Sequence, residues 1–220
     1  SKEVEPYVVE AFHGEKPLDI RTLAPQMGEL GMLGAFLPTE YDCPGANYVE
    51  FGLICQEVER VDSSLRSFVA VTSGLVMYPI WRFGSEEQRK YWLPRLASGE
   101  AIGCYGLTEP NHGSDPGSME STAEWDGSHW VLNGSKTWIT EADIADMAVV
   151  FAKDVSDGKI KGFIVEAGTK GFTQSSLDQK GSMRAGGVGE LGMVNCRIPD
   201  ENRLPEALGL KAPFSCLNQA

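Results

Sequence analysis

Residues 107–115 read Leu-Thr-Glu-Pro-Asn-His-Gly-Ser-Asp and residues 138–140 read Trp-Ile-Thr, just beyond the point where the chain changes from helical to strand-like sequence. The first stretch combines hydroxyl groups with a rigid proline and a flexible glycine. Such a loop offers backbone N–H groups and hydroxyls to a polar ring or a pyrophosphate. The second places the indole of Trp138 beside the hydroxyl of Thr140, which suits stacking against an aromatic ligand. Taken singly, each stretch also fits an ordinary turn-rich connection or strand.

Helix signals fill the first hundred residues. Caps are predicted at Asn47, at Asp62 or the serine after it, and at Ser85. Gln88, three positions after Ser85, completes a capping box. We therefore predict an N-terminal α-helical domain over residues 1–100.

Strand signals fill the next hundred residues. The tight-turn dipeptides Asp126-Gly127, Asn133-Gly134 and Asp157-Gly158 separate short apolar runs. Consecutive strands joined by short turns predict an antiparallel barrel or sandwich. The expected fold class is therefore α+β, with the helical domain followed by an antiparallel β-barrel domain over residues 101–200 and a tail over residues 201–220.

Composition excludes several classes of function. The 220 residues carry 19 basic against 31 acidic side chains, a formal charge of -12, which disfavours nucleic acid because phosphate neutralisation needs Lys and Arg. The five cysteines are widely spaced and the three histidines are dispersed, so we predict reduced thiols and no metal site. No apolar run reaches the length of a membrane span, and we expect no membrane association.

One glycine motif requires separate weighing. Residues 187–192 match the G-x-G-x-x-G pattern of dinucleotide sites. That fingerprint needs a strand before it and a helix after it, whereas here a polar loop precedes the glycines and a strand-like run follows. A glycine-rich loop is the better interpretation.

Considered jointly, the loop at residues 107–115 and the Trp-Ile-Thr triplet resemble the flavin-binding signature of the acyl-CoA dehydrogenases. The resemblance covers nearly the whole chain and implies the fold and the FAD cofactor of that family. It rests on further stretches that are similar to the family's pattern: Met27–Gly34, Tyr41–Gly45, Phe83–Gln88, Leu93–Glu100, Leu132–Thr140 and Lys180–Arg184. Gly186-Gly187 departs from the polar pair more usual there.

The resemblance also implies roles for particular residues. Thr108 and the backbone of Tyr105, Gly106 and Leu107 would hold the pyrimidine side of the flavin ring. Trp138 would lie against the ring, Thr140 near its N5 atom, and Ser114 would face both the cofactor phosphates and the acyl-CoA. Gly113 and Ile139 complete the expected cofactor-binding set.

Within the family, residues 60–67 are most similar to the glutaryl-CoA dehydrogenases, in which the residues matching Arg66 and Ser67 bind the distal carboxylate of the substrate. Arg66 lies in an otherwise apolar helical run, and a buried arginine is rare unless it is paired. A guanidinium there suits bidentate binding of a carboxylate. An internal ion pair with Glu57 or Glu59 is the alternative.

The family's α,β-dehydrogenation needs a carboxylate base, which the resemblance places in a C-terminal helical domain. Residues 201–220 are similar only to the start of that domain. We therefore assign no catalytic residue in this sequence and expect the 220-residue chain by itself to be inactive. The implied function is glutaryl-CoA oxidation with decarboxylation, in the cytoplasm or the mitochondrial matrix, with an electron-transfer flavoprotein as partner and a homo-oligomeric assembly. The alternatives are a dehydrogenase or oxidase of another short acyl-CoA, and a non-catalytic module that binds FAD or acyl-CoA.

Overall fold

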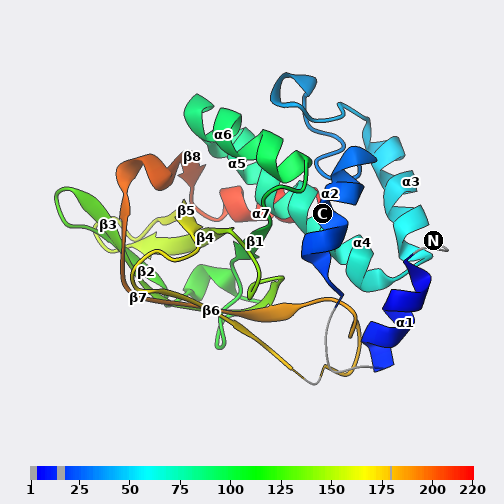
Figure 1. Ribbon diagram of the computed structural model, residues 1–220. Coiled ribbons are helices and arrows are strands. Elements are labelled where there is room, and N and C mark those ends of the chain that lie inside the picture. Colours follow the sequence, from blue (N-terminus) through cyan, green and yellow to red (C-terminus); the bar gives the residue numbers. More distant parts are fainter. Residues whose placement is uncertain (1–3, 14–17, 179) are drawn as a thin grey trace.

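The computed structural model describes residues 4–13, 18–178 and 180–220, and its helices gather on one side of a sheet (Figure 1). The described part of the helical half contains eight segments: α1 Glu5–His13, α2 Ile20–Glu29, η1 Thr39–Tyr41, α3 Tyr48–Glu59, α4 Ser63–Ala70, η2 Val71–Met77, α5 Tyr78–Phe83 and α6 Glu86–Ala97. The predicted caps are formed, because Asn47, Asp62 and Ser85 each accept a backbone N–H of the helix that follows. None of the helices in the described ranges is long and apolar enough to cross a membrane.

A π-helical segment interrupts the longest helical run. The chain continues from α4 through η2, which is π-helical, into α5 without leaving the helix. The apolar sequence predicted one continuous helix here, but it did not predict the π-helical segment within it. Single π turns inside helices occur often at functional sites, and Val71 and Leu75 of η2 line a cavity described below.

Among the residues described in the second half are eight strands: β1 Gly103–Gly106, β2 Thr122–Trp125, β3 His129–Thr140, β4 Met147–Asp154, β5 Ile160–Glu166, β6 Phe172–Ser176, β7 Val188–Pro199 and β8 Arg203–Leu208. The short helices η3 Pro116–Ser118 and η4 Asp200–Asn202 lie between strands, and α7 Lys211–Leu217 follows β8. The strand order is β6-β7-β3-β2-β4-β5-β8, with β1 pairing to β4 off this path.

The predicted antiparallel barrel is wrong in two respects. The path of paired strands is open, ending at β6 and β8, and the sheet is mixed, because β4 runs parallel to both β1 and β2. The tail also adds β8 to the sheet by pairing with β5. The prediction assumed that neighbours in sequence pair in space, whereas β1 pairs with β4 and not with β2, the next strand in sequence.

The central strand β4 separates two hydrophobic cores. Val149 and Phe151 belong to the core that α5 and α6 cover, whereas Ala148 and Val150 belong to the core that Leu191 of β7 shares. Because successive side chains of a strand point to opposite faces, both faces of β4 are buried. This explains why residues 147–152 read as an unbroken apolar run.

The prediction of a turn at Asn133-Gly134 is also wrong, because strand β3 continues through both residues. The dipeptide forms a bulge instead, since the pairing with β7 shifts register between Leu132 and Gly134. Gly134 has a φ of 140° and lies so close to Ser121 that an added Cβ would be 2.3 Å from its Oγ. A glycine required by close packing was thus misinterpreted as a turn glycine.

Glycines of the G-x-G-x-x-G motif likewise serve packing. Gly189 and Gly192 lie in β7 opposite β6, and a strand rather than a helix follows the motif. A Cβ on Gly189 would lie 1.9 Å from the carbonyl oxygen of Ser175, which is backbone and cannot move away alone.

We expect Gly189→Ala to lower the free energy of unfolding by about 1–3 kcal/mol, because overpacking forces the two strands apart. Urea denaturation checks this. Gly52→Ala is the matched control, because Gly52 lies in α3 with nothing within 4 Å of its Cβ position, and alanine there should stabilise the helix by up to about 1 kcal/mol. Equal stabilities for both variants would contradict the packing role of Gly189.

Candidate functional site

Two cavities meet at the end of β3. The strand-end cavity, of about 340 Å³, lies between η2, the loop after β1, β3 and α7. The loop cavity, of about 590 Å³, lies between α4, the end of β3 and the segment of residues 177–188. Trp138 and Thr140 line both cavities, so the Trp-Ile-Thr triplet forms the wall that the two cavities share.

A second bulge in β3 presents Trp138 to the cavities. The pairing with β7 shifts again between Lys136 and Ile139, and Trp138 has a φ of 62°. Its indole is therefore turned outward and is 66% exposed, while Ile139 is buried. A left-handed backbone is uncommon for a bulky residue, and bulges often re-aim a side chain beside a functional site.

Most of the predicted cofactor-binding residues come together in the strand-end cavity. Eight of the nine line it: Tyr105, Leu107, Thr108, Gly113, Ser114, Trp138, Ile139 and Thr140. The exception is Gly106, whose Cβ position faces Lys136 and Leu191 instead. The amide of Thr137 donates to the carbonyl of Thr108 at 2.9 Å, which holds the loop after β1 directly against β3.

The cavities also contain residues that the sequence did not indicate. Val71 and Leu75 from η2, with Phe214 and Leu217 from α7, give the strand-end cavity an apolar side. Phe214 and Leu217 are 43% and 46% exposed. Only their spacing along one helix turn could have indicated a shared face, and nothing in the sequence places that face beside β3.

The predicted substrate-binding residues separate. Ser67 lines the loop cavity and Ser114 the strand-end cavity, whereas Arg66 lines neither. The expectation of a buried Arg66 is wrong, because its side chain is 38% exposed and its Nε donates to Glu59 Oε2 at 3.0 Å. The ion pair with Glu59, left open as an alternative, is therefore formed. Arg66 lies in the middle of α4, with its side chain partly exposed and paired with Glu59.

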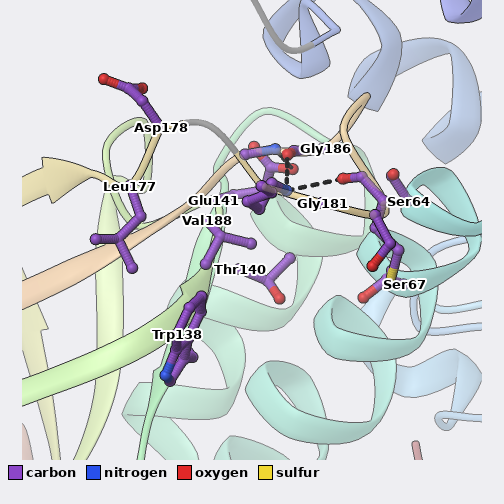
Figure 2. A pocket seen from close by; sticks show the side chains of 14 residues that line it. Ser64, Ser67, Trp138, Thr140, Glu141, Leu177, Asp178, Gly181, Gly186 and Val188 are labelled. Atoms are coloured by element: carbon purple, nitrogen blue, oxygen red, sulfur yellow. Dashed lines mark hydrogen bonds between the residues drawn. The ribbon is translucent and has the colours of Figure 1, made fainter. Parts of the chain in front are cut away.

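Glu141 is a buried carboxyl group that the sequence did not single out. It follows the Trp-Ile-Thr triplet, is 2% exposed, and its Oε1 accepts the amide of Gly187 at 3.1 Å. Burial raises the pKa of Glu141 to about 8, and the charge of Asp143 adds to the rise. In Figure 2, Glu141 is drawn next to Gly181 and Gly186, with Ser64 and Ser67 of α4 to one side. The Glu141 carboxyl group therefore holds the segment of residues 181–188 in place at the loop cavity.

The side chain of Lys180 also stabilises the segment of residues 181–188. Its Nζ donates to the carbonyl oxygens of Met183 and Gly186. Burial lowers the pKa of Lys180, and the charges of Glu141 and Asp62 oppose the fall. Across the cavity, Ser64 is 3% exposed and its Oγ has no hydrogen-bond partner among the described residues.

A helical layer over a mixed sheet, with an exposed indole and hydroxyls around paired cavities, defines the class of a ligand-binding α+β protein. Comparison with known proteins specifies it further. Residues 1–100 match the acyl-CoA dehydrogenase N-terminal domain and residues 104–196 the acyl-CoA dehydrogenase middle domain. The chain belongs to the acyl-CoA dehydrogenase family.

Three relatives illustrate the similarity. A glutaryl-CoA dehydrogenase structure from Mycobacterium smegmatis in complex with FADH2 is 48% identical, with a TM-score of 0.92, over 99% of this chain and 54% of that chain. The mitochondrial short-chain specific acyl-CoA dehydrogenase of Mus musculus is 36% identical over 88% of this chain and 48% of its own length. The mitochondrial isovaleryl-CoA dehydrogenase of Pongo abelii is 38% identical over 84% and 45%. The chain thus spans about half the length of these relatives.

Proposed function

We propose that this chain forms the FAD-binding and acyl-binding part of a glutaryl-CoA dehydrogenase. The observation that carries the proposal is the outward-turned Trp138 at the junction of two cavities, one with hydroxyls and apolar side chains and the other reaching α4. The relative in complex with FADH2 supports the cofactor, and its identity of 48% supports the glutaryl-CoA class.

The described residues fit a flavin. A flat, exposed indole suits stacking against an aromatic ring system, and Thr108, Ser114 and Thr140 offer hydroxyls around it. FAD, when bound, supplies the two-electron acceptor for α,β-oxidation. In this proposal Thr108 and the backbone of residues 105–107 hold the polar edge of the ring, and Thr140 orients its reactive side.

The substrate would enter across the shared wall. We place the acyl group beside Trp138 and Thr140, with its distal end toward Ser67 and the guanidinium of Arg66. The terminal nitrogens of Arg66 can bind a carboxylate while Nε keeps Glu59, since a guanidinium carries five N–H donors. Decarboxylation of the oxidised product to crotonyl-CoA, electron transfer to an electron-transfer flavoprotein, and homo-oligomer formation complete the proposed parent activity in the cytoplasm or mitochondrial matrix.

No described residue is assigned the role of the base that removes the α-proton. Glu141, which lines the loop cavity, and Glu109, which directly follows Thr108, both accept backbone amides and are nearly inaccessible. We therefore expect the 220-residue chain by itself to bind without turning over acyl-CoA in a dye-reduction assay.

A second function is favoured by one observation. Because Arg66 already pairs with Glu59, the residue can be a structural partner, and the enzyme can then act on a short acyl-CoA without a carboxylate. The ratio of kcat/KM for glutaryl-CoA to that for butyryl-CoA in the active enzyme separates the two.

The cofactor assignment predicts the effect of Trp138→Ala. Loss of a stacked ring costs about 0.5–1.5 kcal/mol, so the dissociation constant for FAD should rise by roughly 2- to 12-fold at about 1.4 kcal/mol per tenfold. The melting temperature should hardly change, because the indole is exposed. Quenching of FAD fluorescence measures the affinity. Trp125→Ala, at an exposed tryptophan that lines neither cavity, is the control, and equal losses in both variants would refute the assignment.

A further inference from the structure

Beneath the strand-end cavity lies a buried ion pair. The side chains of Lys136 and Glu109 are 0% and 3% exposed, and Lys136 Nζ lies 2.8 Å from Glu109 Oε1. Gly106 leaves room for the lysine, because a Cβ there would lie 3.3 Å from Lys136 Cγ. Lys136 is two residues before Trp138 and Glu109 directly follows Thr108, so the pair lies next to the walls of the cavity.

The pair connects several segments at once. Lys136 Nζ also donates to the carbonyl of Leu107 at 3.2 Å, while Glu109 accepts the backbone amides of Glu120 and Ser121. Strand β3 is thereby joined to the end of β1 and to the start of β2. The loop of residues 107–121, which carries Thr108 and Ser114, is held at both ends by one carboxylate.

Electrostatics shows that the carboxylate is charged. Burial acts to raise the pKa of Glu109, but hydrogen bonds from Lys136, Ser121 and Glu120 outweigh it and lower the pKa to about 2. Burial lowers the pKa of Lys136, and Glu109 opposes the fall. A buried ion pair is weak grounds for stability, because desolvation offsets the attraction. Its hydrogen bonds to the end of β1 and to the start of β2 indicate instead that the pair positions these segments.

We propose that Glu109 and Lys136 form a positioning pair that sets the spacing between the 107–114 loop and Trp138, and thereby the affinity of the strand-end cavity for a flavin. The inference rests on the proposed FAD site. Neither residue touches the cavity, so both act through the neighbours that line it.

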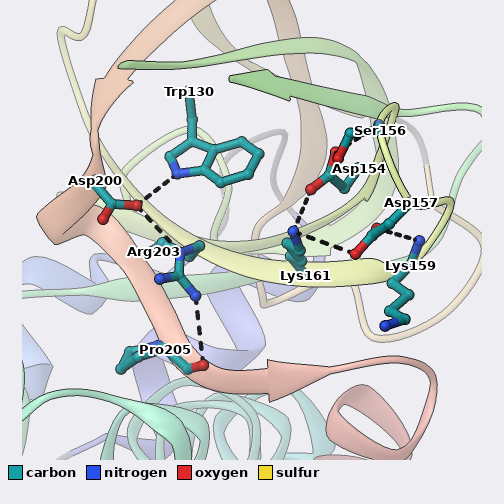
Figure 3. Close-up of polar contacts among 9 residues, drawn as sticks. All are labelled: Trp130, Asp154, Ser156, Asp157, Lys159, Lys161, Asp200, Arg203 and Pro205. Carbon is teal, nitrogen blue, oxygen red and sulfur yellow. Dashed lines mark hydrogen bonds and ion pairs between the residues drawn. The ribbon is translucent and has the colours of Figure 1, made fainter. Parts of the chain in front are cut away.

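A second buried pair in the same sheet provides a matched control. Lys161 and Asp154, with side chains 14% and 2% exposed, form an ion pair in the hairpin of β4 and β5 (Figure 3). Lys161 also lies 3.7 Å from Asp157 and 5.0 Å from the ring centroid of Trp130. None of these residues lines the strand-end cavity, so removal of this pair tests stability alone.

The experiment compares two double variants of the chain, Glu109→Gln with Lys136→Met, and Asp154→Asn with Lys161→Met. Removing both partners avoids a buried unpaired charge, which would cost more than the pair. We expect similar melting temperatures, but a dissociation constant for FAD roughly 10- to 100-fold higher only in the Glu109/Lys136 variant, because loss of about two hydrogen bonds to the ring has an effect of that size. Equal FAD affinity in the two variants would overturn the proposal.

Amide hydrogen exchange without FAD provides an independent measurement. Residues 107–114 should exchange faster in the Glu109/Lys136 variant than in the Asp154/Lys161 variant. If the unsubstituted chain takes up no flavin, the proposed function fails, whereas exchange still decides the positioning role. Unchanged exchange of this loop in the Glu109/Lys136 variant would show that the pair does not position it.

Discussion

Replacing Arg66 by alanine in the active enzyme should lower kcat/KM for glutaryl-CoA by roughly one to three orders of magnitude. The loss of a charge-assisted pair costs about 2–5 kcal/mol, at about 1.4 kcal/mol per tenfold. Because Arg66 is 38% exposed, the lower half of this range is expected. Butyryl-CoA, which has no distal carboxylate, should lose much less.

Two further variants sharpen this test. Arg66→Lys should recover only part of the loss, since an ammonium cannot reproduce the planar guanidinium fork. Arg60→Ala is the matched control, because Arg60 pairs with Glu57 at 3.2 Å on the solvent side, with both side chains more than 60% exposed. Its removal should leave both substrates unaffected. Equal losses for glutaryl-CoA and butyryl-CoA in Arg66→Ala would show that Arg66 is structural, and the second proposed function would then replace the first.

Replacing Glu141 by glutamine should remove a pH dependence of stability. The pKa of Glu141 is raised from 4.5 to about 8 in the folded protein, so between these values the folded state binds more protons than the unfolded state. Stability contributed by the neutral carboxyl is therefore present below the unfolded pKa and is lost as pH rises toward about 8. A tenfold change in a protonation equilibrium corresponds to about 1.4 kcal/mol, so the total loss is at most several kcal/mol.

The variant should therefore be more stable than the unsubstituted chain at pH 8 and similar to it near pH 5. Glutamine can still accept the amide of Gly187, as Glu141 Oε1 does. Urea denaturation at several pH values measures the difference. Glu124→Gln, at an exposed position of β2, should keep the original slope. Parallel pH profiles for Glu141→Gln and the unsubstituted chain would contradict the prediction. Glu109 does not interfere, because its pKa of about 2 places its effect below this range.

Local features of the fold could be predicted because they depend on residues a few positions apart. The caps at Asn47, Asp62 and Ser85 are formed as expected, since a cap needs only a side chain and the next turn of backbone. The hairpin turn at Asp126-Gly127 also forms between paired strands. The same local reasoning failed at Asn133-Gly134, because Gly134 packs against Ser121, which directly precedes β2.

The candidate site was indicated as two separate segments, and eight of its nine expected cofactor residues line one cavity. The sequence could not reveal that a bulge turns Trp138 outward, because the bulge is defined only by the register against β7. Nor could it reveal the exposure of Arg66 or the burial of Glu141. Burial of a side chain depends on the residues that pack against it. For Glu141 these include Gly187, which is far from it in the sequence.

By itself, then, the sequence determined the order of a helical half and a strand-rich half, the cap residues, and the two segments that carry the family's flavin signature. Only the tertiary structure decided the mixed, open sheet, the shared wall between two cavities, and the ion pair of Lys136 with Glu109 beneath it. The physical reason is the distance along the chain between the residues that decide each feature. Capping and turn formation are settled within one turn of backbone, whereas strand register and charge burial depend on contacts between residues far apart along the chain.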